Sequence, residues 1–88
     1  MAKKLNWDIK LEDGEHKVSL VYSMLSGKAI VNIDGDEFDI STGFFKLRGT
    51  SQVFKLGDDA ALLDFPKKGA PDIYIDGVGV HSGKRQGE

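Results

Sequence analysis

Three Asp-Gly pairs constrain the fold more than any other feature of this sequence. They stand at Asp13-Gly14, Asp34-Gly35 and Asp76-Gly77, each between runs in which apolar and polar residues alternate. A two-residue hairpin of type I′ needs a positive φ at both central residues, and Asp and Gly tolerate that conformation well. Each pair therefore predicts a tight turn between two antiparallel strands.

The runs between these turns have the period of two that is typical of half-buried strands. Trp7 stands in phase with Ile9 and Leu11, which predicts that Trp7 belongs to the core. Further strands are expected over 17–25, 28–33, 37–41, 44–47, 53–56, 60–65 and 73–75, with 78–80 extending the last hairpin. Seven to eight short strands with regular turns indicate an all-β fold, either a sandwich or a small barrel.

Length and cysteine content limit the classes of protein. A chain of 88 residues makes one domain, which we place at residues 7–81, after a lead-in over 1–6 and before a polar tail over 82–88. The absence of cysteine excludes a disulfide scaffold and a cysteine nucleophile. No apolar run is long enough for a transmembrane helix or a signal peptide, so we expect a cytoplasmic protein without a membrane partner.

The charge balance argues against nucleic acid as a partner. The chain has 12 Lys and Arg against 14 Asp and Glu, and its net charge is −2. Residues 1–44 carry five basic and eight acidic groups, and residues 45–88 carry seven and six. Neither half has the basic excess that binding to phosphates requires.

No motif in the sequence predicts a metal, a cofactor or a catalytic centre. The Ser26-Gly27-Lys28 segment lacks the first glycine and the final hydroxyl of a phosphate-binding loop, so we interpret it as a turn. The acidic run over 34–39 lacks the spacing of an EF-hand and fits a solvated hairpin. His16 and His81 are too few for a zinc site without cysteine, and we expect His16 to be a cross-strand neighbour or an exposed ring. We expect no enzyme activity; a hydrolase using either histidine is the least favoured alternative.

Two groups of apolar residues are candidate contact residues. Phe44 and Phe45 are adjacent, so in a strand they would point to opposite faces, with one in the core and the other available for contact. Val21, Leu25 and Ile30 fall on the nominally polar face of the strands over 17–25 and 28–33. If these strands pair, the three side chains form an exposed patch or an interface with another chain.

Several turn and core segments follow one another in an order that resembles a known family. They are Trp7-Asp8-Ile9-x-Leu11-x-Asp13-Gly14-x-His16-x-Val18, Ser26-Gly27-Lys28, Asp34-Gly35, Phe45-Lys46-Leu47-x-Gly49, Phe54-x-Leu56-Gly57 and Ile75-Asp76-Gly77. Together they resemble the Fas apoptosis inhibitory molecule (FAIM) family from Trp7 to Val80, and most closely the first of its two domains. The resemblance implies a β-sandwich of two antiparallel four-stranded sheets, with no catalytic activity and no cofactor.

The resemblance also implies a function through protein contacts. Animal members of the family restrain death-receptor apoptosis and counter protein aggregation in this way. We therefore expect a non-catalytic protein-interaction domain with an unidentified protein partner. The alternative is a small-ligand or carbohydrate-binding sandwich, which would need a concave sheet face with exposed Tyr22, Tyr74 or Trp7. Sequence alone does not identify the edge strands, so monomer and homodimer both stay open.

Overall fold

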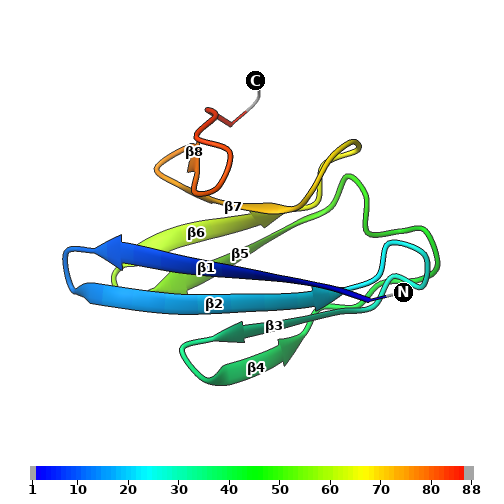
Figure 1. Cartoon of the computed structure of the whole chain (residues 1–88), viewed down its shortest axis with the longest axis horizontal. Helices are drawn as coiled ribbons and strands as arrows, with labels where there is room; N and C mark the ends of the chain where they lie inside the picture. Colours follow the sequence, from blue (N-terminus) through cyan, green and yellow to red (C-terminus); the bar gives the residue numbers. More distant parts are fainter. Residues whose placement is uncertain (1, 87–88) are drawn as a thin grey trace. The chain divides into compact units, whose positions relative to one another are not determined.

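The chain is all-β and forms two four-stranded antiparallel sheets (Figure 1). The structure is a computed structural model that describes residues 2–86. The first sheet lies in a compact unit that ends at Arg48, and the second lies in a unit that begins at Gly49. The predicted fold class, with two antiparallel sheets and eight short strands in residues 2–86, is confirmed.

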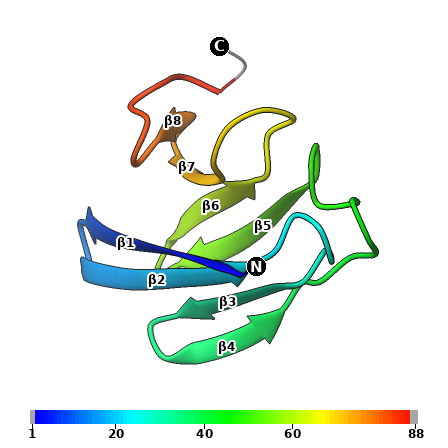
Figure 2. The ribbon, with the colours of Figure 1, turned by 45° about the vertical axis from the view of Figure 1, so that its right-hand side comes forward.

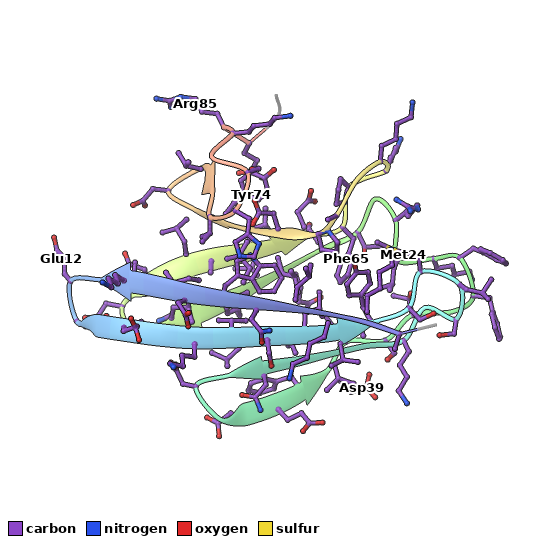
Figure 3. The ribbon with its side chains drawn as sticks, in the orientation of Figure 1. Glu12, Met24, Asp39, Phe65, Tyr74 and Arg85 are labelled. Atoms are coloured by element: carbon purple, nitrogen blue, oxygen red, sulfur yellow. The ribbon has the colours of Figure 1, made fainter. Side chains whose placement is uncertain are left out.

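The first sheet is a simple meander. It contains, in spatial order, β1 (Lys3–Leu11), β2 (Gly14–Tyr22), β3 (Ala29–Ile33) and β4 (Asp36–Asp39). Because each strand reverses the chain direction, the turns at 12–13 and 34–35 lie at one end of this sheet, here called the hairpin end (Figures 1 and 2). The segments 23–28 and 40–48 lie at the opposite end, here called the loop end. Among the labelled side chains, Glu12 lies at the hairpin end, and Met24 and Asp39 lie at the loop end (Figure 3).

One face of this sheet supplies most of the buried side chains of its unit. Trp7 pairs with Val18, and Leu5 pairs with Leu20 in the β1–β2 register. Trp7, Val18 and Leu20 are at most 2% exposed. The prediction that Trp7 is a core residue is confirmed. The neighbours of these residues along each strand point to the opposite face and are mainly polar, as a period of two requires.

The second sheet repeats the meander with shorter strands. It contains, in spatial order, β5 (Ser51–Leu56), β6 (Asp59–Asp64), β7 (Asp72–Ile75) and β8 (Val78–Gly79). The carboxylate of Asp72 is buried and accepts backbone hydrogen bonds from Ile73, His81 and Ser82 at 2.8–3.1 Å. These bonds tie the segment after β8 to the start of β7, and they satisfy donors that would be costly to leave unpaired.

Two of the three Asp-Gly turns have the predicted backbone conformation. Asp34 has φ 50° and Gly35 has φ 97°, and they connect β3 to β4. Asp76 has φ 51° and Gly77 has φ 80°, and they connect β7 to β8. A positive φ at both central residues is the condition for a type I′ turn.

The prediction of a two-residue turn at Asp13-Gly14 is wrong by one position. Leu11 pairs with Gly14, so the reversal is made by Glu12 and Asp13, and Gly14 is already the first residue of β2. The left-handed conformation belongs to Gly14 alone, with φ 132°, and not to Asp13. Asp13 instead directs its carboxylate toward the ring of His16, three residues further along the chain.

The prediction of a strand over 44–47 is also wrong. Turns and bends occupy residues 43–45 and 47–49, and no ladder pairs this segment. Because the segment is not extended, adjacent side chains need not alternate between core and solvent. Phe44 and Phe45 are both exposed, and Leu47 is the buried residue of this segment.

The strand ends also differ from the predicted boundaries. β1 begins at Lys3, so part of the predicted lead-in over 1–6 belongs to the first sheet. Arg85, in the predicted tail over 82–88, forms an isolated bridge with Val78. Residues 1, 87 and 88 of these two segments lie outside the described residues. Within residues 2–86 no helix is long and apolar enough to cross a membrane.

Candidate protein-contact site

Two loops are joined by backbone hydrogen bonds at the loop end of the first sheet. The N–H of Thr42 donates to the carbonyl of Gly27 at 2.7 Å, and the N–H of Phe45 donates to the carbonyl of Leu25 at 3.1 Å. The N–H of Ile40 extends this pattern from the sheet by donating to Ala29 at 2.9 Å. The segment 40–45 is therefore held along the segment 25–29.

A close backbone approach fixes the two loops against each other. Gly27 is buried and has φ 79°, a conformation that favours glycine. A Cβ atom at this position would overlap the carbonyl oxygen of Gly43. From the sequence, we interpret Ser26-Gly27-Lys28 as a turn. Its glycine has a second role, because only a residue without a Cβ atom lets Gly43 of the second loop come this close.

The joined loops present three large apolar side chains to solvent. Leu25 is 55% exposed, Phe44 is 71% exposed and Phe45 is 73% exposed. These side chains are here called the Phe loop cluster. Leu25 was predicted to lie in a strand, but β2 ends at Tyr22 and Leu25 stands in the turn that follows.

Phe45 also carries backbone strain. Its φ is 61°, and left-handed conformation in a residue with a Cβ atom costs about 1–2 kcal/mol. A positive φ is uncommon in a bulky residue, and strained residues are enriched at functional sites. The Phe45 ring is exposed, so this cost is not offset by burial of the ring within the chain itself.

The other two candidate contact residues form a cross-strand pair. Val21 of β2 is directly opposite Ile30 of β3, so the pairing required by the sequence prediction is present. Val21 is 37% exposed, and Ile30 is half-buried. The side of the first sheet opposite its buried side chains is here called the outer face. On this face, Lys4 of β1 pairs with Val21 and Asp39 of β4 pairs with Ile30, so the four residues form one row across the strands. This row lies near the loop end and adds a smaller apolar surface there.

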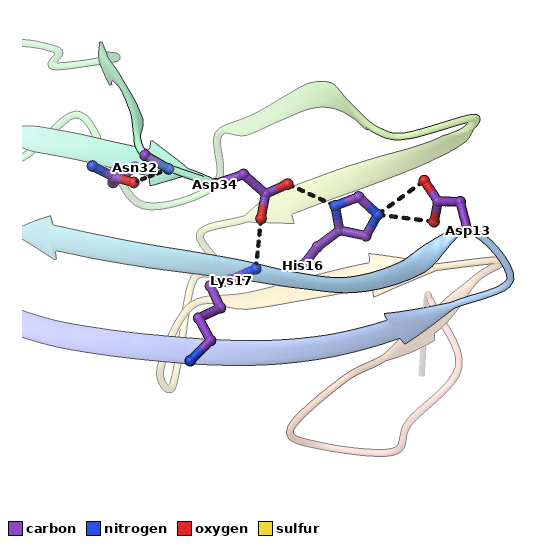
Figure 4. A network of polar contacts seen from close by, with 6 residues as sticks. Asp13, His16, Lys17, Asn32 and Asp34 are labelled. Carbon is purple, nitrogen blue, oxygen red and sulfur yellow. Dashed lines mark hydrogen bonds and ion pairs between the residues drawn. The ribbon is translucent and has the colours of Figure 1, made fainter.

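A polar cluster at the hairpin end was not predicted. The Nδ1 atom of His16 lies 2.6 Å from Oδ2 of Asp34, and Nε2 lies 2.9 Å from Oδ1 of Asp13 (Figure 4). The second oxygen of Asp34 accepts the backbone N–H of Lys17 at 2.8 Å. His16 therefore connects the turn of the β1–β2 hairpin to the turn of the β3–β4 hairpin. Of the two alternatives expected for His16, the structure has the cross-strand neighbour, since His16 pairs with Ile9 and its side chain is only 13% exposed.

This arrangement favours the protonated form of His16. A carboxylate only accepts hydrogen bonds, and a neutral imidazole has one N–H, so both ring nitrogens can be satisfied only in the imidazolium form. Hydrogen bonds to Asp34 and Asp13 accordingly raise the pKa of His16. The hydrogen bond from His16, followed by that from the backbone of Lys17, lowers the pKa of Asp34.

His16, Asp13 and Asp34 together are here called the ionic clamp. The imidazole stands between the two carboxylates (Figure 4). Within residues 2–86 no group of three or more His, Cys, Asp or Glu side chains is arranged to hold a metal ion. The clamp could have been predicted from the strand order. In a meander, the β1–β2 turn and the β3–β4 turn lie at the same end of the sheet, so residues of the two turns can meet.

The outer face of β1–β3 contains a shallow hollow of about 750 Å³. Its lining is mostly polar and includes Asn6, Ser19 and Asn32, which stand opposite one another in one row across the strands. The carbohydrate-binding alternative needs an exposed aromatic ring on such a face, but Trp7 and Tyr22 are 1% and 5% exposed. The hollow therefore lacks the aromatic platform that this alternative requires.

A further apolar row on the second sheet was not predicted. Val53 is 69% exposed and pairs with Leu62, which in turn pairs with Tyr74. Leu62 and Tyr74 are half-buried. Because the three residues are paired in register, they lie on the same face of the second sheet. This could not be predicted from the sequence without knowing how β5, β6 and β7 pair.

Comparison with known proteins places these features in a family. A family model described as Fas apoptotic inhibitory molecule (FAIM1) matches residues 3–80. The chain belongs to this family. The resemblance predicted from the turn and core segments is thereby confirmed, and the match includes both sheets and the Phe loop cluster.

Curated relatives match a shorter part of the chain. Fas apoptotic inhibitory molecule 1 of Mus musculus is 40% identical over 48 residues, which is 54% of this chain and 27% of the mouse protein. The Homo sapiens protein of the same name is 39% identical over 51 residues, which is 58% of this chain and 28% of the human protein. These alignments thus span little more than a quarter of each relative. No solved structure matches the chain.

Proposed function

We propose that this chain is a non-catalytic protein-interaction domain whose contact site is the Phe loop cluster. The observation that carries the proposal is the exposure of Leu25, Phe44 and Phe45 on two loops that are fixed by backbone contacts. Aromatic side chains in preorganised positions contribute most of the free energy of many protein–protein contacts. We also propose that the protein acts in the cytoplasm. Its sequence contains no cysteine, so it does not need an oxidising compartment in which to form disulfides.

The family supports the biological part of the proposal. The name of the mammalian relatives associates them with inhibition of apoptosis triggered by Fas. We propose that this chain likewise acts on apoptosis or on protein aggregation by binding other proteins. The membership in the family and the exposed cluster support this role independently of each other.

Quantitative affinity capture with three baits tests the proposal. The baits are the wild-type chain, the double variant Phe44→Ser with Phe45→Ser, and the control Val53→Ser. Loss of an aromatic contact residue costs about 2 kcal/mol or more, so proteins bound through the cluster should bind the double variant at least about 30-fold more weakly. Val53→Ser removes an equally exposed apolar side chain from the second sheet and should capture the same proteins as wild type.

Circular dichroism of all three baits checks that they are folded. Exposed substitutions change the free energy of unfolding by about 0.5 kcal/mol or less, so a loss of capture would not come from unfolding. The same set of proteins on all three baits would contradict the proposed contact site.

A further inference from the structure

The charges of the first sheet are divided between its two ends. Exposed cations gather at and near the loop end, at Lys3, Lys4, Lys28, Lys46 and Arg48, where the acidic residue is Asp39. Acidic residues gather at and near the hairpin end, at Glu12, Asp13, Glu15, Asp34, Asp36 and Glu37, where the basic residues are Lys10 and Lys17. A chain with net charge −2 thus has a locally basic end.

The basic end coincides with the exposed apolar side chains. Lys46 directly follows Phe45, and the aliphatic part of its side chain lies against Gly43 in the same loop. Residues 23–28 and 40–48 contain three cations and no acidic residue. The two loops that carry the Phe loop cluster are therefore locally basic as well as apolar, and they favour an anionic partner that also offers apolar groups.

We infer that an acidic segment of a partner protein, with apolar side chains between its carboxylates, docks on the loop end of the first sheet. This inference rests on the proposed function and specifies the chemistry of the partner. The apolar side chains of the segment contact Leu25, Phe44 and Phe45, and its carboxylates lie near Lys46 and Lys28.

Two observations favour an acidic protein segment over an anionic membrane surface. Asp39 stands at the loop end, and hydrogen bonds from the side chain and backbone of Ser41, together with the charge of Lys28, lower its pKa. An anionic lipid surface would place negative charge against Asp39, whereas a protein segment can set its carboxylates near Lys46 and Lys28 and pass Asp39 with an uncharged residue. The row of Lys4, Val21, Ile30 and Asp39 also continues the surface onto the outer face, which an extended chain can follow.

Selection from a phage-displayed library of short random peptides tests the inference. The wild-type chain is the target, and the double variant Phe44→Ser with Phe45→Ser is used to remove peptides that bind elsewhere. We expect the selected peptides to carry net negative charge together with aromatic or aliphatic residues. Their affinity should fall as salt is raised, because exposed charges are screened.

A charge-reversal pair then tests the electrostatic part. Lys46→Glu, at the cluster, should weaken binding of a selected peptide by about tenfold at low salt. Lys10→Glu makes the same change on β1 near the hairpin end and should leave the affinity unchanged. Replacing the acidic residues of the peptide by Asn and Gln should reproduce the effect of Lys46→Glu.

Three results would overturn the inference. Neutral or basic peptides that still depend on Phe44 and Phe45 would refute the acidic partner but leave the proposed function intact. Failure to select any peptide that depends on these residues would contradict both proposals. Binding of the wild-type chain to phosphatidylserine vesicles, lost in the double variant and without selection of acidic peptides, would identify a membrane surface as the occupant.

Discussion

The two ends of the first sheet use side chains in opposite ways. At the hairpin end, His16 joins Asp13 and Asp34, and the charged groups of this clamp satisfy one another. At the loop end, Phe44 and Phe45 remain in solvent, and Phe45 has a left-handed backbone conformation. The comparison indicates that charged side chains at the hairpin end are paired within the chain, whereas the proposed contact site at the loop end keeps its apolar side chains exposed.

The largest expected effect on stability comes from the backbone contact between the two loops. Gly27→Ala places a Cβ atom against the carbonyl of Gly43 and forces alanine into a positive φ. We expect the free energy of unfolding to fall by roughly 2–4 kcal/mol, as measured by urea denaturation.

A matched glycine variant isolates the contact from the backbone conformation. Gly35 has φ 97°, but a Cβ atom there meets nothing within 4 Å. Gly35→Ala should therefore cost only the conformational term of about 1–2 kcal/mol. Equal losses at Gly27 and Gly35 would show that the contact with Gly43 does not hold the loops together.

A smaller effect of opposite sign is expected at Phe45. Phe45→Gly removes the left-handed strain and should raise the free energy of unfolding by up to about 1 kcal/mol, while weakening partner binding. Phe44 has no positive φ, so Phe44→Gly should lower stability by roughly 0.5–1 kcal/mol through added freedom of the unfolded chain. Thermal and urea denaturation of both variants measure this difference in stability. If Phe45→Gly lowered the free energy of unfolding, Phe45 would not be strained in the folded chain.

The smallest expected effect is the pH dependence of the clamp. The pKa of His16 is raised on folding, so its contribution to stability is complete below about pH 6.5 and fades as pH rises through the raised pKa. The pKa of Asp34 is lowered, so its contribution is present above about pH 3.9 and fades as pH falls through the lowered pKa. The clamp therefore stabilises the chain most between these two values.

Two variants check this window. Melting temperatures of His16→Gln and Asp34→Asn, measured across pH, should lie furthest below the wild-type values between about pH 4 and 6.5 and approach them above it. The double variant should lose little more than either single variant, since both remove the same interaction. If the melting temperatures of the variants differed from that of the wild type by the same amount at every pH, the imidazolium form of His16 would not stabilise the fold. Glu37→Gln, which removes an exposed charge, serves as the control.

The strands could be predicted largely because their signals are local. Alternation over Trp7, Ile9 and Leu11 identifies β1, and the Asp-Gly pairs at 34–35 and 76–77 identify two turns. The strand predicted over 44–47 failed because this part of the chain is held by contacts with Leu25 and Gly27, which are distant in the sequence. The alternation of apolar and polar residues within a segment gives no information about contacts with a distant part of the chain.

The proposed contact site could be predicted from the sequence only in part, for the same reason. Leu25, Phe44 and Phe45 were named from their positions in expected strands, and the structure brings them together through loops instead. The clamp at His16 was missed because it needs the order of the strands and not only their presence. Charge segregation between the two ends likewise appears only when the register is known.

The most direct test of the account is to map where a selected peptide binds. Amide chemical shifts of the isotope-labelled chain, recorded by NMR during titration with the peptide, identify the residues at the contact. We expect the largest changes at Leu25 and over 43–46, and small changes at 12–13 and 34–35. Changes concentrated at the hairpin end or on β5–β7 would contradict the assignment of the loop end as the contact site.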